Sequence, residues 1–276
     1  MFELRFEAAS LLKQIIDAIK ELTDQCTIEV SSTGLALQAM DSSHVSLITF
    51  KLKAEFFASY RCDRTLNLGL NLKVLNKLLK TVSNTDKATL RAEDDGDQLK
   101  LIIESPRRTT TFDVKLIDLE AEVLNINTSE PKATIKMASA EFKQICADLL
   151  PLGDTLVMEI TKDGISFSVT GSDTSGTVTV RTDAEPAEDE GARTEIQLQE
   201  PLTISFALRL LSQFTKATPL SPTVELRVSS DQPLCVSYEI GTDGHGSIQY
   251  YLAPKIEDEE TVEPTATSAV VDDDDE

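Results

Sequence analysis

Apolar and polar residues alternate in short runs along most of the chain, and this spacing predicts many half-buried β-strands. Ile28 and Val30 alternate with polar residues, and Leu35 and Leu37 do the same after the turn Ser32-Thr33-Gly34. Two alternating runs joined by a short segment with glycine predict a β-hairpin.

Two short stretches have the spacing of an amphipathic helix instead. The first is predicted to begin after Ser10, which is a suitable N-cap residue, and the second to run from Leu72 to Lys80. The apolar stripes are Leu11, Leu12, Ile15, Ile16 and Ile19 in the first helix and Leu72, Leu75, Leu78 and Leu79 in the second. Short helices among many strands predict an α+β fold with antiparallel sheets.

This arrangement occurs twice in the chain. Lys13-Gln14-Ile15 recurs as Lys143-Gln144-Ile145, and the hairpin glycine Gly34 recurs as Gly164. Later positions recur in the same order, Leu66, Leu72, Leu75, Lys80, Leu90 and Arg91 matching Leu202, Leu208, Leu211, Lys216, Leu226 and Arg227. The repeat predicts two similar domains with two short helices each. We place them at 1–117 and 133–256, with a linker at 118–132 between them.

The composition is that of an ordinary folded protein. The chain has 276 residues, of which 41% are hydrophobic, so it can build packed cores without a disulfide or metal. Its four cysteines stand singly and lack the spacing of zinc ligands, which favours reduced core thiols and predicts no metal site and no cofactor. No run approaches the 18 or so apolar residues of a membrane span, so no membrane association is expected.

The net charge of −21 is unexpected for a protein that binds DNA, because DNA affinity comes mainly from phosphate neutralisation by Lys and Arg. The acids are concentrated, however. From Glu257 to the end there are ten acids and no base, which predicts an acidic disordered tail over 257–276. Another acidic stretch, Asp183 to Glu190, is predicted to be a surface loop.

Basic residues gather on the predicted helices. Lys73, Lys77 and Lys80 are spaced to share the helix face opposite the leucines, and Arg209 and Lys216 repeat this in the second copy. The first-type helices are more mixed, with Lys13 and Lys20 diluted by Asp17 and Glu21, and Lys143 by Glu141 and Asp148. Two interpretations stay open here: a solvated face of an amphipathic helix, or a surface that follows a phosphate backbone without reading bases.

Catalytic chemistry has little support in the sequence. The only histidines are His44 and His245, and neither stands in a nucleophile motif. The glycine-rich phosphate-binding loops of nucleotide enzymes are absent from the sequence as well. We therefore predict that the protein is not an enzyme.

Several longer runs are specific to one family. They are LQAMDSSHVSL from Leu37, YRCDR from Tyr60, LRAED from Leu90, FALRLLSQFTKATPLS from Phe206 and YYLAPKIEDEE from Tyr250. Over residues 1 to about 260 the chain closely resembles the proliferating cell nuclear antigen family, the eukaryotic replicative sliding clamps. The resemblance implies a nuclear homotrimer, a ring with helices lining the hole. The ring would encircle duplex DNA without sequence preference, act as processivity factor for DNA polymerase in replication and repair, and need a separate clamp loader.

The resemblance also implies roles for individual residues. The hole-facing positions carried over are Lys13, Lys20, Lys77, Lys80, Arg209 and Lys216, with Lys73 and Lys143 as additions particular to this chain. Gln144 and Ala147 stand where relatives commonly have arginines, so one stretch of the lining is expected to be less basic. The trimer contact is expected between the edge strand 109–115, with Phe112, and the strand 177–181 of a neighbour, with Val178 and the adjacent Gly176.

Docking of partner proteins is the second implied role. DNA polymerase, flap endonuclease, ligase and the clamp loader would insert a short motif with a glutamine and paired hydrophobic and aromatic residues into a pocket beneath the linker. The matching positions are Met40, His44, Val45, Leu47, Leu124, Ile126, Pro233, Ala253, Pro254, Lys255 and Ile256. From the residues alone, Met40, Val45 and Leu47 read as core, and Asp41 and Glu122 as surface charges. Lys162 matches the family's ubiquitin and SUMO acceptor, or is simply a turn lysine.

Two other functions remain as alternatives. A checkpoint-type clamp subunit would share the fold but form a heterotrimer. An acidic interaction scaffold, such as a histone chaperone, would use the tail as its working part. Deletion from Glu263 onward separates the scaffold from the ring, because a ring retains its hold on closed circular DNA without the tail.

Overall fold

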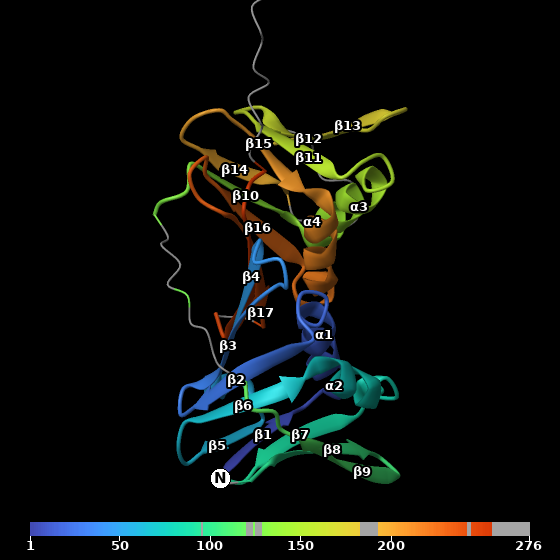
Figure 1. The fold of residues 1–276 in the computed structure, drawn as a ribbon, viewed down its shortest axis with the longest axis vertical. Coiled ribbons are helices and arrows are strands. Elements are labelled where there is room, and N and C mark those ends of the chain that lie inside the picture. The colour runs from blue at the N-terminus through green and yellow to red at the C-terminus, as the bar shows by residue number, and fades with distance from the viewer. Residues whose placement is uncertain (95, 120–123, 125–128, 183–192, 242–243, 256–276) are drawn as a thin grey trace, which may run out of the picture.

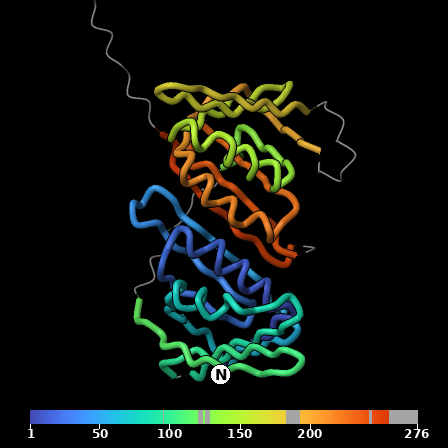
Figure 2. Tube along the Cα trace, turned by 90° about the vertical axis from the view of Figure 1, so that its right-hand side faces the viewer, coloured from blue at the N-terminus to red at the C-terminus, as the bar shows by residue number. Residues whose placement is uncertain are grey.

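The computed structural model describes all residues except 95, 120–123, 125–128, 183–192, 242–243 and 256–276. The predicted acidic loop, the predicted tail, Glu122, Ile126 and Ile256 therefore lie outside the described residues. The molecule is elongated, with its two halves end to end and its helices along one side (Figure 1). Figure 2 looks onto that helical side.

The first half consists of nine strands, two α-helices and one short 3-10 helix among the described residues. They are β1 (Phe2–Phe6), α1 (Ala9–Ile19), β2 (Gln25–Ser31), β3 (Gly34–Met40), β4 (Ser46–Lys53), η1 (Ala54–Phe56), β5 (Ser59–Cys62), β6 (Leu66–Asn71), α2 (Leu72–Leu79), β7 (Lys87–Ala92), β8 (Gln98–Ser105) and β9 (Arg108–Lys115). The predicted hairpin around Gly34 is confirmed, and Gly34 has a φ of 138°, a backbone conformation that favours glycine.

The second half repeats the order of strands and α-helices within the described part of the chain, although its 3-10 helix stands at a different place. Its elements are β10 (Ala133–Ala138), α3 (Ser139–Leu149), β11 (Thr155–Ile160), β12 (Gly164–Thr170), β13 (Ser175–Arg181), β14 (Glu195–Leu198), β15 (Leu202–Ala207), α4 (Leu208–Phe214), η2 (Thr215–Leu220), β16 (Thr223–Val228), β17 (Leu234–Ile240) and β18 (Gly246–Leu252). The α+β prediction with two short helices in each copy is confirmed.

The start of the first helix differs from the prediction. Helix α1 begins at Ala9, so Ser10 lies inside its first turn and makes no cap. The backbone N–H of Ala9 donates to the carbonyl oxygen of Asp86 at 2.7 Å, so a neighbouring loop satisfies the helix end that a cap residue would otherwise serve. Helix α2 does have a cap: the side chain of Asn71 accepts a hydrogen bond from the Val74 N–H at 3.1 Å.

Each helix buries its apolar stripe against a sheet. On α2, Leu72, Leu75 and Leu79 are buried, while Lys73 and Lys77 are exposed. Because the buried and exposed positions separate cleanly, burial fixes which face of the helix points away from the sheet. The basic face of α2 therefore lies outward on the helical side of the molecule.

One sheet joins the two halves. The described strands form a five-stranded sheet (β5-β1-β7-β8-β9), a nine-stranded sheet (β14-β10-β16-β17-β18-β4-β3-β2-β6) and a four-stranded sheet (β13-β12-β11-β15). In the nine-stranded sheet, β18 of the second half pairs antiparallel with β4 of the first, and Tyr250 lies opposite Ile48. We call this β4–β18 pairing the internal seam.

The internal seam is reinforced by aromatic and helical packing. The ring of Tyr250 stacks on that of Phe214 with centroids 4.6 Å apart, and its hydroxyl donates to the carbonyl oxygen of Ala18 at 3.2 Å. Helix α1 of the first half also packs against η2 of the second. Both halves therefore share one continuous core across the seam.

The counterparts of β4 and β18 in the other half are β13 and β9, and each is an edge strand of its own sheet, paired on one side only among the described residues. They lie at opposite ends of the molecule, β9 at the bottom and β13 at the top of Figure 1. A single chain therefore contains the internal seam once in paired form and once as two separated edges.

Candidate functional site

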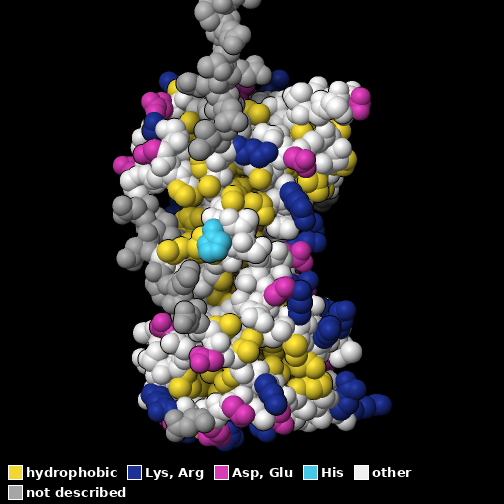
Figure 3. Space-filling view, viewed as in Figure 1, with side chains coloured by type: hydrophobic (Ala, Val, Ile, Leu, Met, Phe, Trp, Pro, Cys, Tyr) yellow, Lys and Arg dark blue, Asp and Glu magenta, His cyan; other side chains and the backbone are white. Residues whose placement is uncertain are grey.

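The positions expected to face the hole lie on the helices or just beyond their ends. Lys13 is on α1, Lys73 and Lys77 on α2, Lys143 on α3 and Arg209 on α4, while Lys20, Lys80 and Lys216 follow the ends of α1, α2 and α4. Lys and Arg side chains follow the helical edge at the right of Figure 3. The fold thus brings the predicted basic positions to one side of the molecule.

Their charges are not equally available. The Nζ atom of Lys73 lies 2.6 Å from Asp24 Oδ2, and that of Lys20 lies 3.0 Å from Glu21 Oε1 and 3.5 Å from Asp17 Oδ1. Burial acts to lower the pKa of Lys20, but Glu21 and Asp17 together hold it above its usual value. These two lysines are already neutralised in part.

The remaining six basic positions, Lys13, Lys77, Lys80, Lys143, Arg209 and Lys216, have no carboxylate within 4 Å among the described residues. On α3, where arginines were expected to be missing, the Gln144 amide donates to Asp148 Oδ1 at 2.6 Å. Glu141 and Asp148 are exposed on this helix beside Lys143. The exposed face of α3 therefore carries one basic residue, Lys143, against two acidic ones.

The expected docking residues gather where four neighbouring strands end. Met40 at the end of β3 pairs with Leu47 on β4, and the Ala253 N–H donates to the carbonyl oxygen of Val45 at 3.2 Å. Pro233 directly precedes β17, next to Ala253 after β18, because Leu234 pairs with Leu252. Apolar residues from distant parts of the chain thus meet at one end of the nine-stranded sheet.

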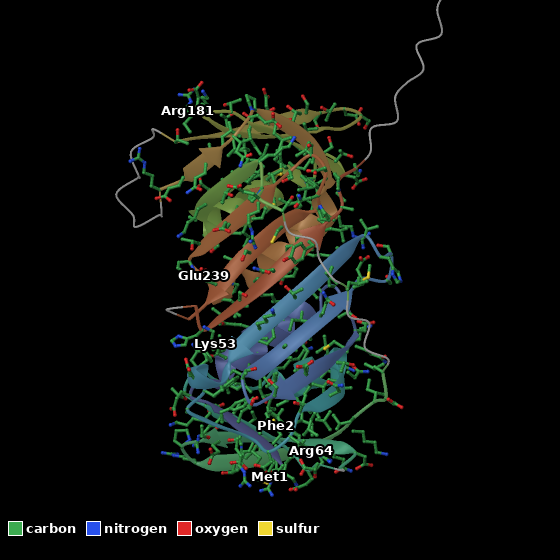
Figure 4. The ribbon with its side chains drawn as sticks, turned by 90° about the vertical axis from the view of Figure 1, so that its left-hand side faces the viewer. Met1, Phe2, Lys53, Arg64, Arg181 and Glu239 are labelled. Atoms are coloured by element: carbon green, nitrogen blue, oxygen red, sulfur yellow. The ribbon has the colours of Figure 1, made fainter. Side chains whose placement is uncertain are left out.

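The outward-facing side chains of β4 are apolar at the start of the strand and charged at its end. Lys51 and Lys53 project outward and are exposed, whereas Leu47 projects to the same face and is only 8% exposed. Figure 4 looks onto this face of the sheets, opposite the helices, with Lys53 and Glu239 near its middle. We call the four residues Met40, Leu47, Pro233 and Ala253 the apolar floor.

Two of the interpretations made from the residues alone are wrong. Val45 is 41% exposed and so is not core, whereas Asp41 is 8% exposed and so is not a surface charge. Val45 lies in the loop between β3 and β4, directly before β4 begins. Leu47 is buried, as a core residue would be, although it faces outward.

Asp41 is buried because its carboxylate organises that loop. It accepts hydrogen bonds from the backbone N–H groups of Ser43 at 2.9 Å, Val45 at 3.0 Å and Ser46 at 2.6 Å, and from the Ser43 and Ser46 hydroxyls. Burial raises the pKa of Asp41, but these hydrogen bonds outweigh it and hold the pKa below its ordinary value. His44 in the same loop has a φ of 57°, an uncommon conformation that the carboxylate helps to maintain. The sequence Asp41-Ser42-Ser43 is typical of such a side-chain-capped turn and could have revealed this role.

The linker meets the sheet at Gln38, a residue that sequence reasoning missed. The Gln38 amide donates to the carbonyl oxygen of Leu124 at 2.9 Å and accepts from the Leu124 N–H at 2.6 Å. Leu124 therefore lies over β3, beside the apolar floor, while Ile126 is outside the described residues. A hollow of about 670 Å³ adjoins this point, lined by Gln38, Met40, His44 and Leu119 among others.

The remaining docking positions are spread more widely. His44 is exposed at the tip of its loop, and Pro254 is half-buried. Lys255 leaves the floor: its backbone N–H donates to the carbonyl oxygen of Ser205 at 2.8 Å, and its Nζ to Thr155 Oγ1 at 2.5 Å. The end of the described chain is thus attached to β15 and β11 of the second half.

The expected trimer contact positions lie on the two free edges. Phe112 is half-buried on β9, and Gly176 and Val178 are on β13. Beside Phe112 is a recess of about 510 Å³ lined in part by Val74 and Leu78, and Val74 is 41% exposed. At the other edge, a Cβ atom on Gly176 would lie 2.5 Å from Leu152 Cδ1, so a larger residue there would require the Leu152 side chain to shift.

Other chemistry is not supported in the described part of the molecule. Groups of three or more metal-ligating side chains do not occur there, and the described helices are all too short or too polar to cross a membrane. Cys26 and Cys146 are buried, and burial raises the pKa of each thiol to about 12. Lys162 is exposed in the turn between β11 and β12.

Comparison with protein families agrees with the doubled fold. Residues 1–124 match the family model described as the N-terminal domain of proliferating cell nuclear antigen. Residues 125–255 match the model described as its C-terminal domain. Together the two matches cover all of the described residues, and they meet within the linker.

Proposed function

Since this chain belongs to the proliferating cell nuclear antigen family, the sliding clamps, we propose that it acts as a homotrimeric ring around duplex DNA. The family supports a role in DNA replication and is generally non-catalytic. The ring, its three copies and its partners are our proposal. The observation that supports it most directly is the internal seam, whose two halves recur as free edges.

The repeat predicts how neighbouring chains would pair. Gly34 pairs with Lys53 and Gly164 with Arg181, so Ile48, five residues before Lys53, corresponds to Gly176. In the same way, the pairing of Leu99 with Val114 corresponds to the pairing of Leu234 with Leu252. Tyr250, two residues before Leu252, therefore corresponds to Phe112, two residues before Val114. Because Ile48 lies opposite Tyr250 within the chain, Gly176 of one chain would lie opposite Phe112 of the next.

The surfaces beside the free edges fit this pairing. In the internal seam Tyr250 packs on Phe214, whose counterpart is Leu78, and Leu78 lines the recess beside Phe112. On the opposite edge, Leu150 at the end of α3 is 36% exposed, close to Leu149 and Leu152 behind Gly176. Joining the edges would bury these apolar side chains and remove two unpaired strands, which are otherwise an aggregation hazard.

Head-to-tail contacts of this kind close into a ring when their rotation allows it, and the family resemblance gives three copies. In such a ring the helical side faces the hole. The Lys and Arg side chains on α1, α2 and α4 that have no carboxylate partner then contact DNA phosphates weakly, without recognising the nucleotide sequence. Enclosure then provides retention, while the contacts remain weak enough for sliding. Nuclear localisation and modification of Lys162 are part of the same proposal.

The apolar floor beneath the linker serves as the docking site for replication proteins. A short partner motif would place its apolar and aromatic anchors on Met40, Leu47, Pro233 and Ala253, with Leu124 above them. The domains 1–117 and 133–256 carry the ring, and the linker 118–132 carries part of the pocket. DNA polymerase, flap endonuclease, ligase and the clamp loader are the partner classes that we expect.

The test combines mass and topology. Light scattering of the purified chain should give three subunits, and rings loaded on closed circular DNA should be released when the circle is cut. Phe112→Ala should dissociate the ring, because removing a buried Phe side chain costs about 3–5 kcal/mol, or roughly 100-fold or more in affinity at each joint. Thr109→Ala, on the exposed side of the same strand, is the matched control.

Three results would overturn the proposal. A stable monomer at micromolar concentration would favour a checkpoint-type subunit that needs other chains. Retention that persists after the circle is cut would show ordinary DNA binding in place of enclosure. Loss of retention on deletion from Glu263 onward would favour the acidic scaffold.

A further inference from the structure

We propose that Gln38 is a positioning residue for partner docking, because its side chain holds the linker at Leu124 above the apolar floor. This inference rests on the proposed docking function and assigns a part of it to a residue that the family resemblance did not indicate. The carrying observation is a pair of hydrogen bonds between one side chain and one backbone unit 86 residues away.

The linker is attached firmly at both ends. At its start, the Leu116 N–H donates to the carbonyl oxygen of Asp97 at 2.8 Å, and the Ile117 N–H donates to that of Gly69 at 2.9 Å. At its end, the Lys132 N–H donates to Ser229 Oγ at 3.2 Å, and Lys132 Nζ lies 2.6 Å from Glu200 Oε1. The Gln232 amide also donates to Ser129 Oγ.

Between Ile117 and Ser129, Leu124 is the one described residue with a hydrogen bond to the body of the protein. Both of its backbone polar groups are used in that contact. The Gln38 amide therefore does for Leu124 what a neighbouring β-strand would do, without a strand being present.

Gln38 is well placed to fix the position of Leu124 relative to the sheet. Its backbone pairs with Thr49 within the nine-stranded sheet, so the side chain starts from a rigid base. Ala36, Gln38 and Met40 alternate on the outward face of β3, so Gln38 is the outward neighbour of Met40 in the apolar floor. Fixing Leu124 there sets the wall of the pocket directly beside its floor.

The physical consequence is a lower cost of binding. A segment that is held in place before the partner arrives loses less conformational freedom when the partner docks. Without the amide contact, the partner itself would have to order the linker. Gln38 therefore contributes to affinity without needing to touch the partner.

The repeat supports a specific role over a general structural one. Ser168 is the counterpart of Gln38 on β12 and cannot make the same two-bond contact. The flanking attachment is repeated, since Lys255 bonds to Ser205 as Ile117 bonds to Gly69. The glutamine thus occurs in the copy where Leu124 of the linker contacts the sheet.

The experiment measures docking and linker protection together in the full chain. The probe is a fluorescent synthetic peptide with a glutamine followed by paired hydrophobic and aromatic residues, titrated by anisotropy. Gln38→Ala should weaken peptide binding about 5–10-fold, the worth of one or two hydrogen bonds, mainly through faster dissociation. Hydrogen exchange of the Leu124 amide should become faster, while the Ile117 amide should be unchanged.

Matched variants separate this role from simple destabilisation. Gln249→Ala changes the same residue type in the same cross-strand row, since Gln38 pairs with Thr49 and Thr49 with Gln249, and it should bind peptide normally. Gln38→Glu keeps an acceptor for the Leu124 N–H but loses the donor, so it should protect that amide and give an intermediate affinity. Trimer mass and melting temperature should stay close to those of the unchanged protein in every variant.

The outcomes distinguish the two proposals. Leu47→Ala is the positive control for docking itself. If Leu47→Ala weakens binding and Gln38→Ala does not, the positioning role is wrong and docking stands. If neither change weakens binding, the docking function is wrong as well. Unchanged exchange at Leu124 in Gln38→Ala, or a loss in Gln38→Glu equal to that in Gln38→Ala, would also overturn the assignment.

Discussion

Two lysines on one helix should differ in their contribution to DNA contact, although they lie only one turn apart. Lys73 and Lys77 are both exposed on α2, on the face opposite its buried leucines. Lys73 is paired with Asp24 at 2.6 Å, whereas Lys77 has no carboxylate within 4 Å among the described residues. Lys77→Ala should therefore weaken DNA contact, and Lys73→Ala should have a smaller effect.

The magnitude follows from counterion release. Each phosphate contact contributes about 0.9 to the slope of log affinity against log salt concentration, so one contact changes affinity roughly 3.5-fold between 50 and 200 mM salt. Losing Lys77 should lower the slope by about 0.9 for every Lys77 that contacts the duplex at one time. Lys73 is already paired with Asp24, so it displaces few phosphate counterions when DNA binds, and Lys73→Ala should lower the slope by less than Lys77→Ala does.

The assay is the affinity of the ring for a short fluorescent duplex, measured by anisotropy over a range of salt concentrations. Light scattering on the same samples checks that both variants remain rings of unchanged mass. Equal losses for Lys73→Ala and Lys77→Ala would refute the argument from ion pairing. An unchanged salt slope in Lys77→Ala would show that Lys77 does not contact phosphates.

Three further predictions follow from the site. Lys77→Ala combined with Lys80→Ala should shorten the products of processive DNA synthesis without changing the trimer mass. Asp41→Asn should destabilise the protein at the β3–β4 loop by about 1–3 kcal/mol, measured by denaturant unfolding, and should weaken peptide docking. Because the folded pKa of Asp41 is lowered, the carboxylate stabilises the protein above its unfolded pKa of about 3.9, and this stabilisation is lost as the pH falls through the lower folded pKa. The free energy of unfolding of the variant should therefore depend less on pH in that acid range. Cys26 and Cys146, with a pKa of about 12, should resist iodoacetamide at pH 8 in the folded protein and react only on unfolding, which mass spectrometry can follow.

The sequence was most informative where the determining interactions are local. The spacing of Leu72, Leu75 and Leu79 was enough to predict α2 and its basic outer face, because each leucine lies about one helical turn from the next. The start of α1 could not be predicted in the same way, because the Ala9 N–H is satisfied by Asp86, far along the chain. Local capping rules favoured Ser10 as the N-cap because they take no account of a hydrogen-bond partner far away in the sequence.

The site divides along the same line. The repeat and the family resemblance indicated the edge strands and most docking positions, whereas the pairing of Ile48 with Tyr250 depends on strand register between distant segments. The ion pair of Lys73 with Asp24 and the contact of Gln38 with Leu124 also join residues far apart in sequence. Nothing in the local pattern distinguishes Gln38 from any other outward-facing polar residue of a strand.

The two free edges β9 and β13 have a consequence for how the ring would assemble. They lie at opposite ends of the chain, so one molecule cannot satisfy them by folding back on itself. A pair of molecules joined once still presents one edge of each kind, and only closure removes the last two. Every open assembly intermediate would therefore have an unpaired edge strand at each end. The order in which subunits meet would affect the time to closure but not the final state. The rate of ring formation after synthesis should depend steeply on subunit concentration. At a low concentration, a larger share of the subunits would remain in open intermediates that have unpaired edge strands.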